Sequence, residues 1–355
     1  MTPHIDLPLL HRLLGLPERE TPRALLRAAR AAARTLPHLV LSLAERDGLP
    51  LGTGSTDELR RARVRAETYR RFLGLVQAEA GVRVMKGPQL AQRYPADLLR
   101  PAGDLDLVAA DEARLWLAAR AVLAVRQVED IDLTVFQHSG HRDVVIALAW
   151  PSEDPLLDRG YKIEISTMAF PGDGGAVPIR AALPADPWLA DLLALAEERH
   201  QRDFHAKDVL DVLVLAGDAP PGETVAAAAA GLYLAPELAE LLDYAAGFAS
   251  LGPLAPTLER LRAPAAAELA RRARWHPAEA GAADSVADRL ATGRPVYGMP
   301  LRQVSGREDW PVAELREVAG STVLATPVAD LLLVTGELVD PEQFTSVLRA
   351  LGEST

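Results

Sequence analysis

Two aspartates separated by one residue, Asp104 and Asp106, lie in an apolar stretch that reads DLDLVAA. Alternate residues of a β-strand project from the same face, so both carboxylates would point to one side, roughly 6–7 Å apart along the backbone. Carboxylates at that spacing repel each other, and burial strengthens the repulsion unless a cation joins them. Because Mg²⁺ prefers hard oxygen ligands, the pair predicts a magnesium site.

A third carboxylate, Glu164, occurs in a second strand-like stretch, YKIEIS. Its neighbours Ile163 and Ile165 would point to the opposite face of that strand. An acidic side chain inside an apolar strand costs free energy unless it has a partner. A carboxylate on a neighbouring strand would complete a two-metal clamp for phosphoryl transfer. We therefore expect Asp104, Asp106 and Glu164 to hold two Mg²⁺ ions. Mn²⁺ is a second candidate for the metal.

Short segments of strand and helix composition alternate between residues 81 and 170. Those of strand composition are GVRVMKG, DLDLVAA, DLTVFQHSG, RDVVIALAW and YKIEISTMAF, and those of helical composition are PQLAQRYPADLL and DEARLWLAARAVLA. This mixture is typical of a mixed sheet covered by helices. The predicted fold class is α+β, with a mixed-sheet core between N- and C-terminal regions that are mainly helical.

The changes in composition along the chain divide it into four parts. Residues 1–78 are an N-terminal helical region, and residues 79–216 hold the core and the helix that follows it. Residues 217–290 are Ala- and Leu-rich and are typical of a small helical bundle. Residues 291–355 read as a small C-terminal α/β segment, with strand candidates STVLATP and ADLLLVTG before a last helix.

Several motifs occur in a fixed order along the core: Lys86-Gly87, Arg100, Asp104-Leu-Asp106, Lys162-Ile-Glu164, and then HAKDVLDVLVL. Over roughly residues 80–216 this order resembles the DNA polymerase β-type nucleotidyltransferase superfamily. It is similar to two branches of that superfamily. One is the bacterial nucleotidyltransferase family with a KG, R and DxDL signature, and the other comprises the abortive-infection type toxin nucleotidyltransferases.

The resemblance implies an enzyme that moves a nucleoside monophosphate from a nucleoside triphosphate (NTP) to an acceptor hydroxyl and releases pyrophosphate. Asp104 and Asp106 would bind the metals, and Glu164 would bind one metal and assist deprotonation of the acceptor. The nucleotide- and phosphate-binding positions implied by the resemblance are Lys86, Gly87, Arg100, Lys162, Lys207 and Asp208.

Each of these positions has an implied role. Gly87 would allow close approach of the β- and γ-phosphates, with Lys86 as a nearby cation, and Lys162 and Lys207 would neutralise phosphate charge. Asp208 would orient Lys207 or the nucleotide. Arg100 would either brace the loop before the strand or contact phosphate.

The acceptor is left open between a protein, a small molecule and tRNA. Eight arginines offer basic material for RNA, namely Arg23, Arg27, Arg30 and Arg34 at helical spacing, and Arg60, Arg61, Arg63 and Arg65. Against this, 38 Lys+Arg oppose 49 Asp+Glu, for a formal net charge of -11. That balance disfavours DNA as a partner and favours a protein or a small molecule as the acceptor.

Other expectations come from what the sequence lacks and from one departure from the motif. There are no cysteines, which excludes thiolate metal sites. No stretch has the length of a membrane span or the pattern of a secretory signal, so we expect a cytoplasmic protein with no membrane partner. Pro88 follows Gly87, and because proline has no backbone N–H, it removes a donor from the predicted phosphate loop. This proline motivates the alternative of a catalytically inactive nucleotidyltransferase fold that serves as a binding or scaffold module.

Overall fold

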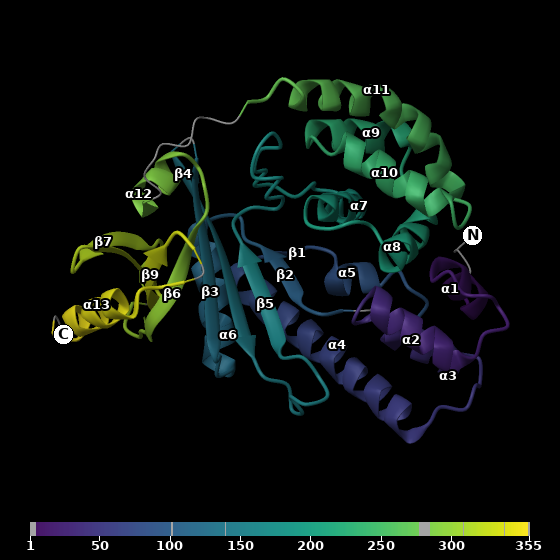
Figure 1. The fold of residues 1–355 in the computed structure, drawn as a ribbon, viewed down its shortest axis with the longest axis horizontal. Helices are drawn as coiled ribbons and strands as arrows, with labels where there is room; N and C mark the ends of the chain where they lie inside the picture. The colour runs from purple at the N-terminus through teal and green to yellow at the C-terminus, as the bar shows by residue number, and fades with distance from the viewer. Residues whose placement is uncertain are drawn as a thin grey trace. The chain divides into compact units, whose positions relative to one another are not determined.

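The computed structural model describes residues 5–100, 102–138, 140–276, 285–307, 309–336 and 338–353. The chain forms two compact units, each assembled from separate stretches of sequence, and Figure 1 labels their elements. The first unit comprises Met1–Arg70, Met85–Gly103 and Phe170–His276. The second comprises Arg71–Val84, Asp104–Ala169 and Pro277–Thr355.

The N-terminal part of the first unit is helical, with α1 (Leu7–Leu13), α2 (Pro22–Ala32), α3 (Leu36–Arg46) and the start of the long α4 (Thr53–Ala80). The Thr21 side chain caps α2 by accepting a hydrogen bond from the backbone N–H of Ala24. Pro37 occupies the first turn of α3, where backbone N–H groups have no hydrogen-bond partner within the helix. The absence of an N–H in proline therefore costs the helix no hydrogen bond. Pro37 therefore marks the start of a new helix, which packs against α2.

The rest of the first unit is also helical. Its elements are α5 (Gly87–Ala91), α7 (Pro187–Glu197), η1 (Glu198–His200), α8 (Ala206–Ala216), α9 (Gly222–Gly231), α10 (Ala235–Ala246), η2 (Gly252–Leu254) and α11 (Ala255–Arg272). Helix α10 packs against the teal helices α7 and α8 and the green helices α9 and α11 of Figure 1. Nearly every side chain of α7 and α8 is buried, so even their charged residues are enclosed by protein. Among the described helices, none combines the length and the apolar composition needed to cross a lipid bilayer.

The second unit is built on one sheet, which has nine strands within the described residues. The strands are β1 (Arg83–Val84), β2 (Leu105–Val108), β3 (Asp130–His138), β4 (His141–Trp150), β5 (Tyr161–Ser166), β6 (Val296–Gln303), β7 (Glu314–Val318), β8 (Ser321–Ala325) and β9 (Ala329–Val334). Their spatial order is β1-β2-β5-β4-β3-β6-β9-β8-β7. Strands β2 and β5 are parallel and their other pairings are antiparallel, so the predicted α+β class with a mixed sheet is confirmed.

The end of α4 and, within the described residues, three further helices complete the second unit: α6 (Glu112–Val125), α12 (Val286–Ala291) and α13 (Pro341–Glu353). Helix α6 packs on β4 and β5 and buries Leu115 and Trp116. Helix α13 places Val347 in an apolar cluster with Val323 and Leu332 of β8 and β9. These contacts cover one part of the sheet with apolar side chains and so fix the positions of its strands.

Two strands, β6 and β7, were not among the predicted ones. Gly298 and Pro300 interrupt the apolar alternation of β6, and the register shifts between Pro300 and Arg302. Strand β6 nevertheless pairs with β3 on one side and with β9 on the other. A side chain at Gly298 would come within 3.0 Å of Leu133 and Leu331, so close strand packing accounts for this glycine. The C-terminal strands therefore continue the sheet that holds β2 and β5.

Candidate functional site

The strand register of the second unit brings two of the candidate metal ligands together. Asp106 on β2 lies directly opposite Glu164 on β5 in the parallel pair, and Asp104 lies two residues earlier, just before β2. Leu105 and Leu107 are fully buried, whereas Asp104 is exposed and Asp106 is half-buried. Because side chains alternate along a strand, the three carboxylates share the face opposite to the leucines.

Lys162 lies on the same face as these carboxylates. Its ammonium donates a hydrogen bond to Glu164 Oε2 at 2.8 Å. Burial alone would lower the pKa of Lys162, but the negative charges of Glu164, Asp104 and Asp106 raise it above its ordinary value. Lys162 is therefore a protonated cation held among the carboxylates.

Strand β3 adds two carboxylates that the sequence analysis missed. Asp132 lies opposite Ala147 of β4, which in turn lies opposite Glu164, so the row crosses four strands, three of which contribute an acidic residue. The pKa of Asp132 is raised by burial and by Asp130, and Lys162 opposes that shift. A signal was present in the sequence, because residues 130–133 read DIDL and repeat the DxDL pattern of residues 104–107.

The carboxylates suit a magnesium ion in their chemistry, because each offers hard oxygen donors and they share a face. Among the described residues, however, no three acidic or imidazole side chains converge closely enough to hold a metal ion as they stand. Lys162 supplies the positive charge at Glu164. An ion bound by Asp104, Asp106 and Glu164 would have to replace the ammonium of Lys162 on the Glu164 carboxylate.

The predicted phosphate loop belongs to the first unit. Lys86 and Gly87 both have positive φ, at 59° and 47°, in the left-handed region that glycine tolerates and other residues adopt at a cost. The ammonium of Lys86 forms an ion pair with Glu198, which also lies 3.2 Å from Arg202. Burial would raise the pKa of Glu198, but Lys86 lowers it below its ordinary value. The ion pair is thus a charged contact that helps to hold the loop.

Pro88 has a structural explanation in this loop. It stands in the first turn of α5, where the N–H that proline lacks would have no partner within the helix. The expected helix over residues 88–99 is wrong in its extent, because α5 ends at Ala91 and turns follow. The irregular segment after it carries Tyr94 and Arg100 to a common buried partner, Asp211.

Arg100 is a bracing residue in this structure. Its Nε and Nη2 each donate to one oxygen of Asp211 at 2.8 Å, and Tyr94 donates to the same carboxylate at 2.7 Å. Nη1 of Arg100 donates to the carbonyl of Gly87 at 3.4 Å. Burial would raise the pKa of Asp211, but Arg100 lowers it. Of the two roles expected for Arg100, these contacts fit support of the Gly87 loop.

Asp208 lies in the first turn of α8 and is almost fully buried. It accepts hydrogen bonds from the backbone N–H of His205 at 2.9 Å and from Arg202 at 2.7 and 2.9 Å. Among the described residues, it has no hydrogen bond or ion pair with Lys207. These contacts cap α8 and anchor Arg202, and they account for Asp208 without a nucleotide.

Lys207 differs from the other candidate cations. Within the described part of the chain its ammonium has no hydrogen bond and no ion pair. Burial lowers its pKa, and the positive charges of Arg100 and Lys86 lower it further, while Asp211 opposes them. A partly buried ammonium beside two other cations is the arrangement expected of a site for an anion.

The candidate residues thus form two groups. Lys86, Gly87, Arg100, Lys207 and Asp208 lie around the buried Asp211 in the first unit, and Asp104, Asp106, Lys162 and Glu164 lie on one sheet face in the second. Asp211 was missed as a site residue, although an acid within the apolar run DVLVLA is itself a signal of a buried partner.

Every lysine of the chain belongs to one of these two groups. Only three of the 38 Lys+Arg residues are lysines, and they are Lys86, Lys162 and Lys207. Arginine serves at every other cationic position, including all the exposed ones. A lysine ammonium is a compact point charge, whereas the guanidinium is a planar fork, so the two are not interchangeable at a phosphate.

Comparisons of the chain with models of protein families, with curated proteins and with solved structures found no match.

Proposed function

We propose that the protein is a Mg²⁺-dependent nucleotidyltransferase that transfers a nucleoside monophosphate from an NTP to an acceptor hydroxyl, with release of pyrophosphate. The observation that carries the proposal is the strand register that sets Asp106 opposite Glu164, with Asp104 and Lys162 on the same face. The position of all three lysines among the candidate residues supports it independently.

Asp104, Asp106 and Glu164 would hold the metal ions, which when bound would neutralise charge on the transferred phosphoryl group and on the leaving pyrophosphate. Lys162 would then release Glu164 and place its charge on a phosphate oxygen. Lys207 would bind phosphate, because within the described part of the chain its ammonium forms no ion pair with a carboxylate. Arg100 would act indirectly, by holding the Gly87 loop against Asp211.

The charge distribution favours a protein or small-molecule acceptor over tRNA. Four of the eight arginines that could bind RNA have acidic partners within the first unit: Arg30 pairs with Glu58, Arg60 and Arg61 with Asp57, and Arg63 with Glu45. Arg65 is buried beside Tyr69. Counterion release by these residues would be small, because their charges are already compensated.

An inactive nucleotidyltransferase fold that serves as a scaffold is the second candidate. Two contacts favour it: Lys162 is bonded to Glu164, and Lys86 is paired with Glu198, so two cations are already compensated by carboxylates. Pro88 no longer supports this candidate, because its place in the first turn of α5 accounts for it.

The test uses the full chain with each α-labelled NTP and Mg²⁺ in a cell extract, followed by separation of RNA, protein and small molecules. The proposal expects label on one of these fractions, and a loss of about 100-fold or more in rate for Asp104→Asn and Asp106→Asn. Glu129→Gln is the matched control, because Glu129 is an exposed carboxylate of the same unit. Equal labelling by the aspartate variants and the wild type would exclude the proposed role. NTP binding with no labelling of any fraction would favour the scaffold.

A further inference from the structure

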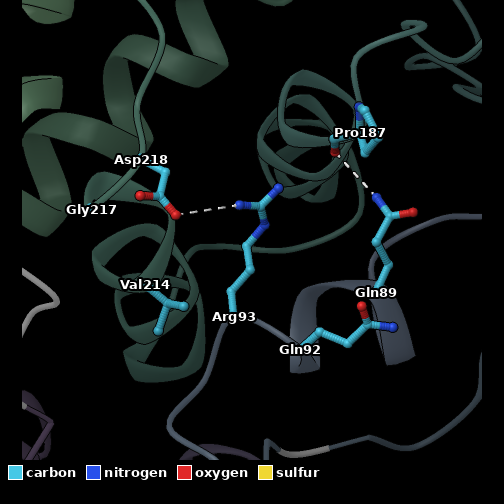
Figure 2. A pocket seen from close by; sticks show the side chains of 7 residues that line it. All are labelled: Gln89, Gln92, Arg93, Pro187, Val214, Gly217 and Asp218. Carbon is cyan, nitrogen blue, oxygen red and sulfur yellow. Dashed lines mark hydrogen bonds and ion pairs between the residues drawn. The ribbon is translucent and has the colours of Figure 1, made fainter.

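A pocket of about 680 Å³ opens in the first unit, and none of the residues assigned above is among those that line it. It lies beside α5, at the start of α7 and at the end of α8, as Figure 2 shows. The residues that line it are Gln89, Gln92, Arg93, Pro187, Val214, Gly217 and Asp218. Four of these seven side chains are polar or charged, which indicates a polar ligand.

Arg93 is the central cation of this pocket. Its Nε lies 3.9 Å from Asp191 Oδ2 and its Nη1 lies 4.0 Å from Asp218 Oδ2, both beyond hydrogen-bond distance. Among the described residues, the Arg93 side chain makes no hydrogen bond, although a guanidinium has five N–H donors in a fork that matches a carboxylate. Figure 2 shows the guanidinium extended between α5 and the end of α8, toward Asp218. Its donors are therefore available to a ligand.

A buried carboxylate also lies close to Arg93. Asp191 of α7 is fully buried, and within the described residues neither of its oxygens has a hydrogen bond of normal geometry. Burial raises its pKa to about 6, and Gln89, Arg93 and Arg100 only partly offset this. A buried carboxylate whose charge is only partly compensated costs free energy. Its nearest positive partner is Arg93, so the negative charge of Asp191 helps to orient the guanidinium.

The remaining polar groups define what else the ligand must carry. Asp218 is largely exposed and offers a carboxylate beside the guanidinium. Gln89 donates from Nε2 to the carbonyl of Pro187 at 3.2 Å, and the Gln92 side chain makes no hydrogen bond within the described part of the chain. With one cation between two carboxylates, the pocket offers a simple anion no net attraction. A ligand that carries both signs of charge fits it better.

We propose that this pocket binds a free α-amino acid. The carboxylate of the amino acid accepts hydrogen bonds from Arg93, and its ammonium is bound by Asp218, so the ligand takes the place of the long contact between these two side chains. Gln89 and Gln92 face the remainder of the ligand. The proposal goes beyond nucleotidyl transfer and does not depend on it, because neither Arg93 nor Asp218 belongs to the metal or phosphate groups.

The experiment is isothermal titration calorimetry of the full chain with each of the standard L-amino acids in the absence of nucleotide. We expect at least one to bind, and Arg93→Gln and Asp218→Asn each to weaken it by about tenfold or more. Arg27→Gln is the matched control, because Arg27 is an exposed arginine of the same unit and makes no ion pair among the described residues. That variant is expected to bind like the wild type.

Two derivatives of the best-binding amino acid separate the proposed contacts. The N-acetyl derivative lacks the ammonium and the C-terminal amide lacks the carboxylate, so each is expected to bind about tenfold or more weakly. The proposal is overturned if no amino acid binds at millimolar concentration, if Arg93→Gln binds as well as Arg27→Gln, or if both derivatives bind as tightly as the parent. Asp191→Asn, which keeps the shape of the buried side chain, is expected to weaken binding less than Arg93→Gln does.

Discussion

Asp106 of β2 and Glu164 of β5 lie directly opposite each other in a parallel strand pair, although they are far apart in the sequence. The pairing sets their carboxylates on the same face as Lys162, which donates a hydrogen bond to Glu164. The electrostatics of this face therefore depend on the contact between Lys162 and Glu164.

Replacement of Glu164 by Gln is expected to lower the pKa of Lys162. Glu164 is the main group that raises this pKa, and the burial that lowers it remains in the variant. Because the chain has only three lysines, NMR titration of isotope-labelled lysine side chains can follow each one. Glu129→Gln is the control and should leave the three titrations unchanged. An unaltered Lys162 titration in Glu164→Gln would show that the contact does not persist in solution.

Arg100→Met and Asp211→Leu are each expected to lower the free energy of unfolding by about 3–5 kcal/mol, because each leaves a buried charge without its partner. The double variant should recover much of the loss, since neither charge remains. Urea denaturation measures the free energy, and hydrogen exchange of α8 reports the local effect. Arg12→Met serves as the control, because Arg12 and Glu18 form an exposed pair whose loss should cost less than about 1 kcal/mol. Equal losses in Arg100→Met and Arg12→Met would contradict the bracing role.

Lys207→Met is expected to raise thermal stability at neutral pH and to weaken NTP binding by about tenfold or more. The folded state lowers the pKa of Lys207, so the unfolded chain binds the proton more strongly. The wild type therefore gains stability as pH rises toward the ordinary lysine value of 10.5, and the advantage of the variant shrinks over that range. Melting temperatures across pH test this, with Lys207→Arg as the charge-preserving control. A variant that is less stable at neutral pH yet binds NTP normally would refute both parts.

Asp191→Asn is expected to be more stable than the wild type above pH 6. The folded pKa of about 6 exceeds the ordinary value of 3.8, so the folded state binds the proton more strongly and wild-type stability falls as pH rises through this interval. The two-unit difference corresponds to at most about 3 kcal/mol. Urea denaturation at pH 8 should show most of this gain, and the gain should vanish near pH 4. A constant difference between the variant and the wild type at all pH values would mean that the carboxyl does not titrate in this range.

The amino-acid sequence by itself determined the chemistry of the candidate site and the faces of its strands. The alternation of apolar and charged residues in 104–108 and 161–166 was enough to predict that Asp106 and Glu164 point away from the apolar face of their strands. The reason is that the two-residue period of a strand is a local property. The α+β class followed in the same way from short apolar segments. Pro88 departs from the nucleotidyltransferase motif, and from the sequence this departure was interpreted as the loss of a phosphate donor. Its position at the start of α5, a local feature of the structure, explains it.

Only the tertiary structure decided which of these local elements meet. The register of β2 on β5, the extension of the acidic row to Asp132, and the junction of β6 with β3 all depend on pairing between distant segments, which apolar alternation does not specify. The same holds for charge partners: Arg100 on Asp211 and Lys86 on Glu198 join residues more than a hundred positions apart. Burial makes such pairs obligatory, because a charge enclosed by protein must find a partner, but packing alone determines which partner it finds.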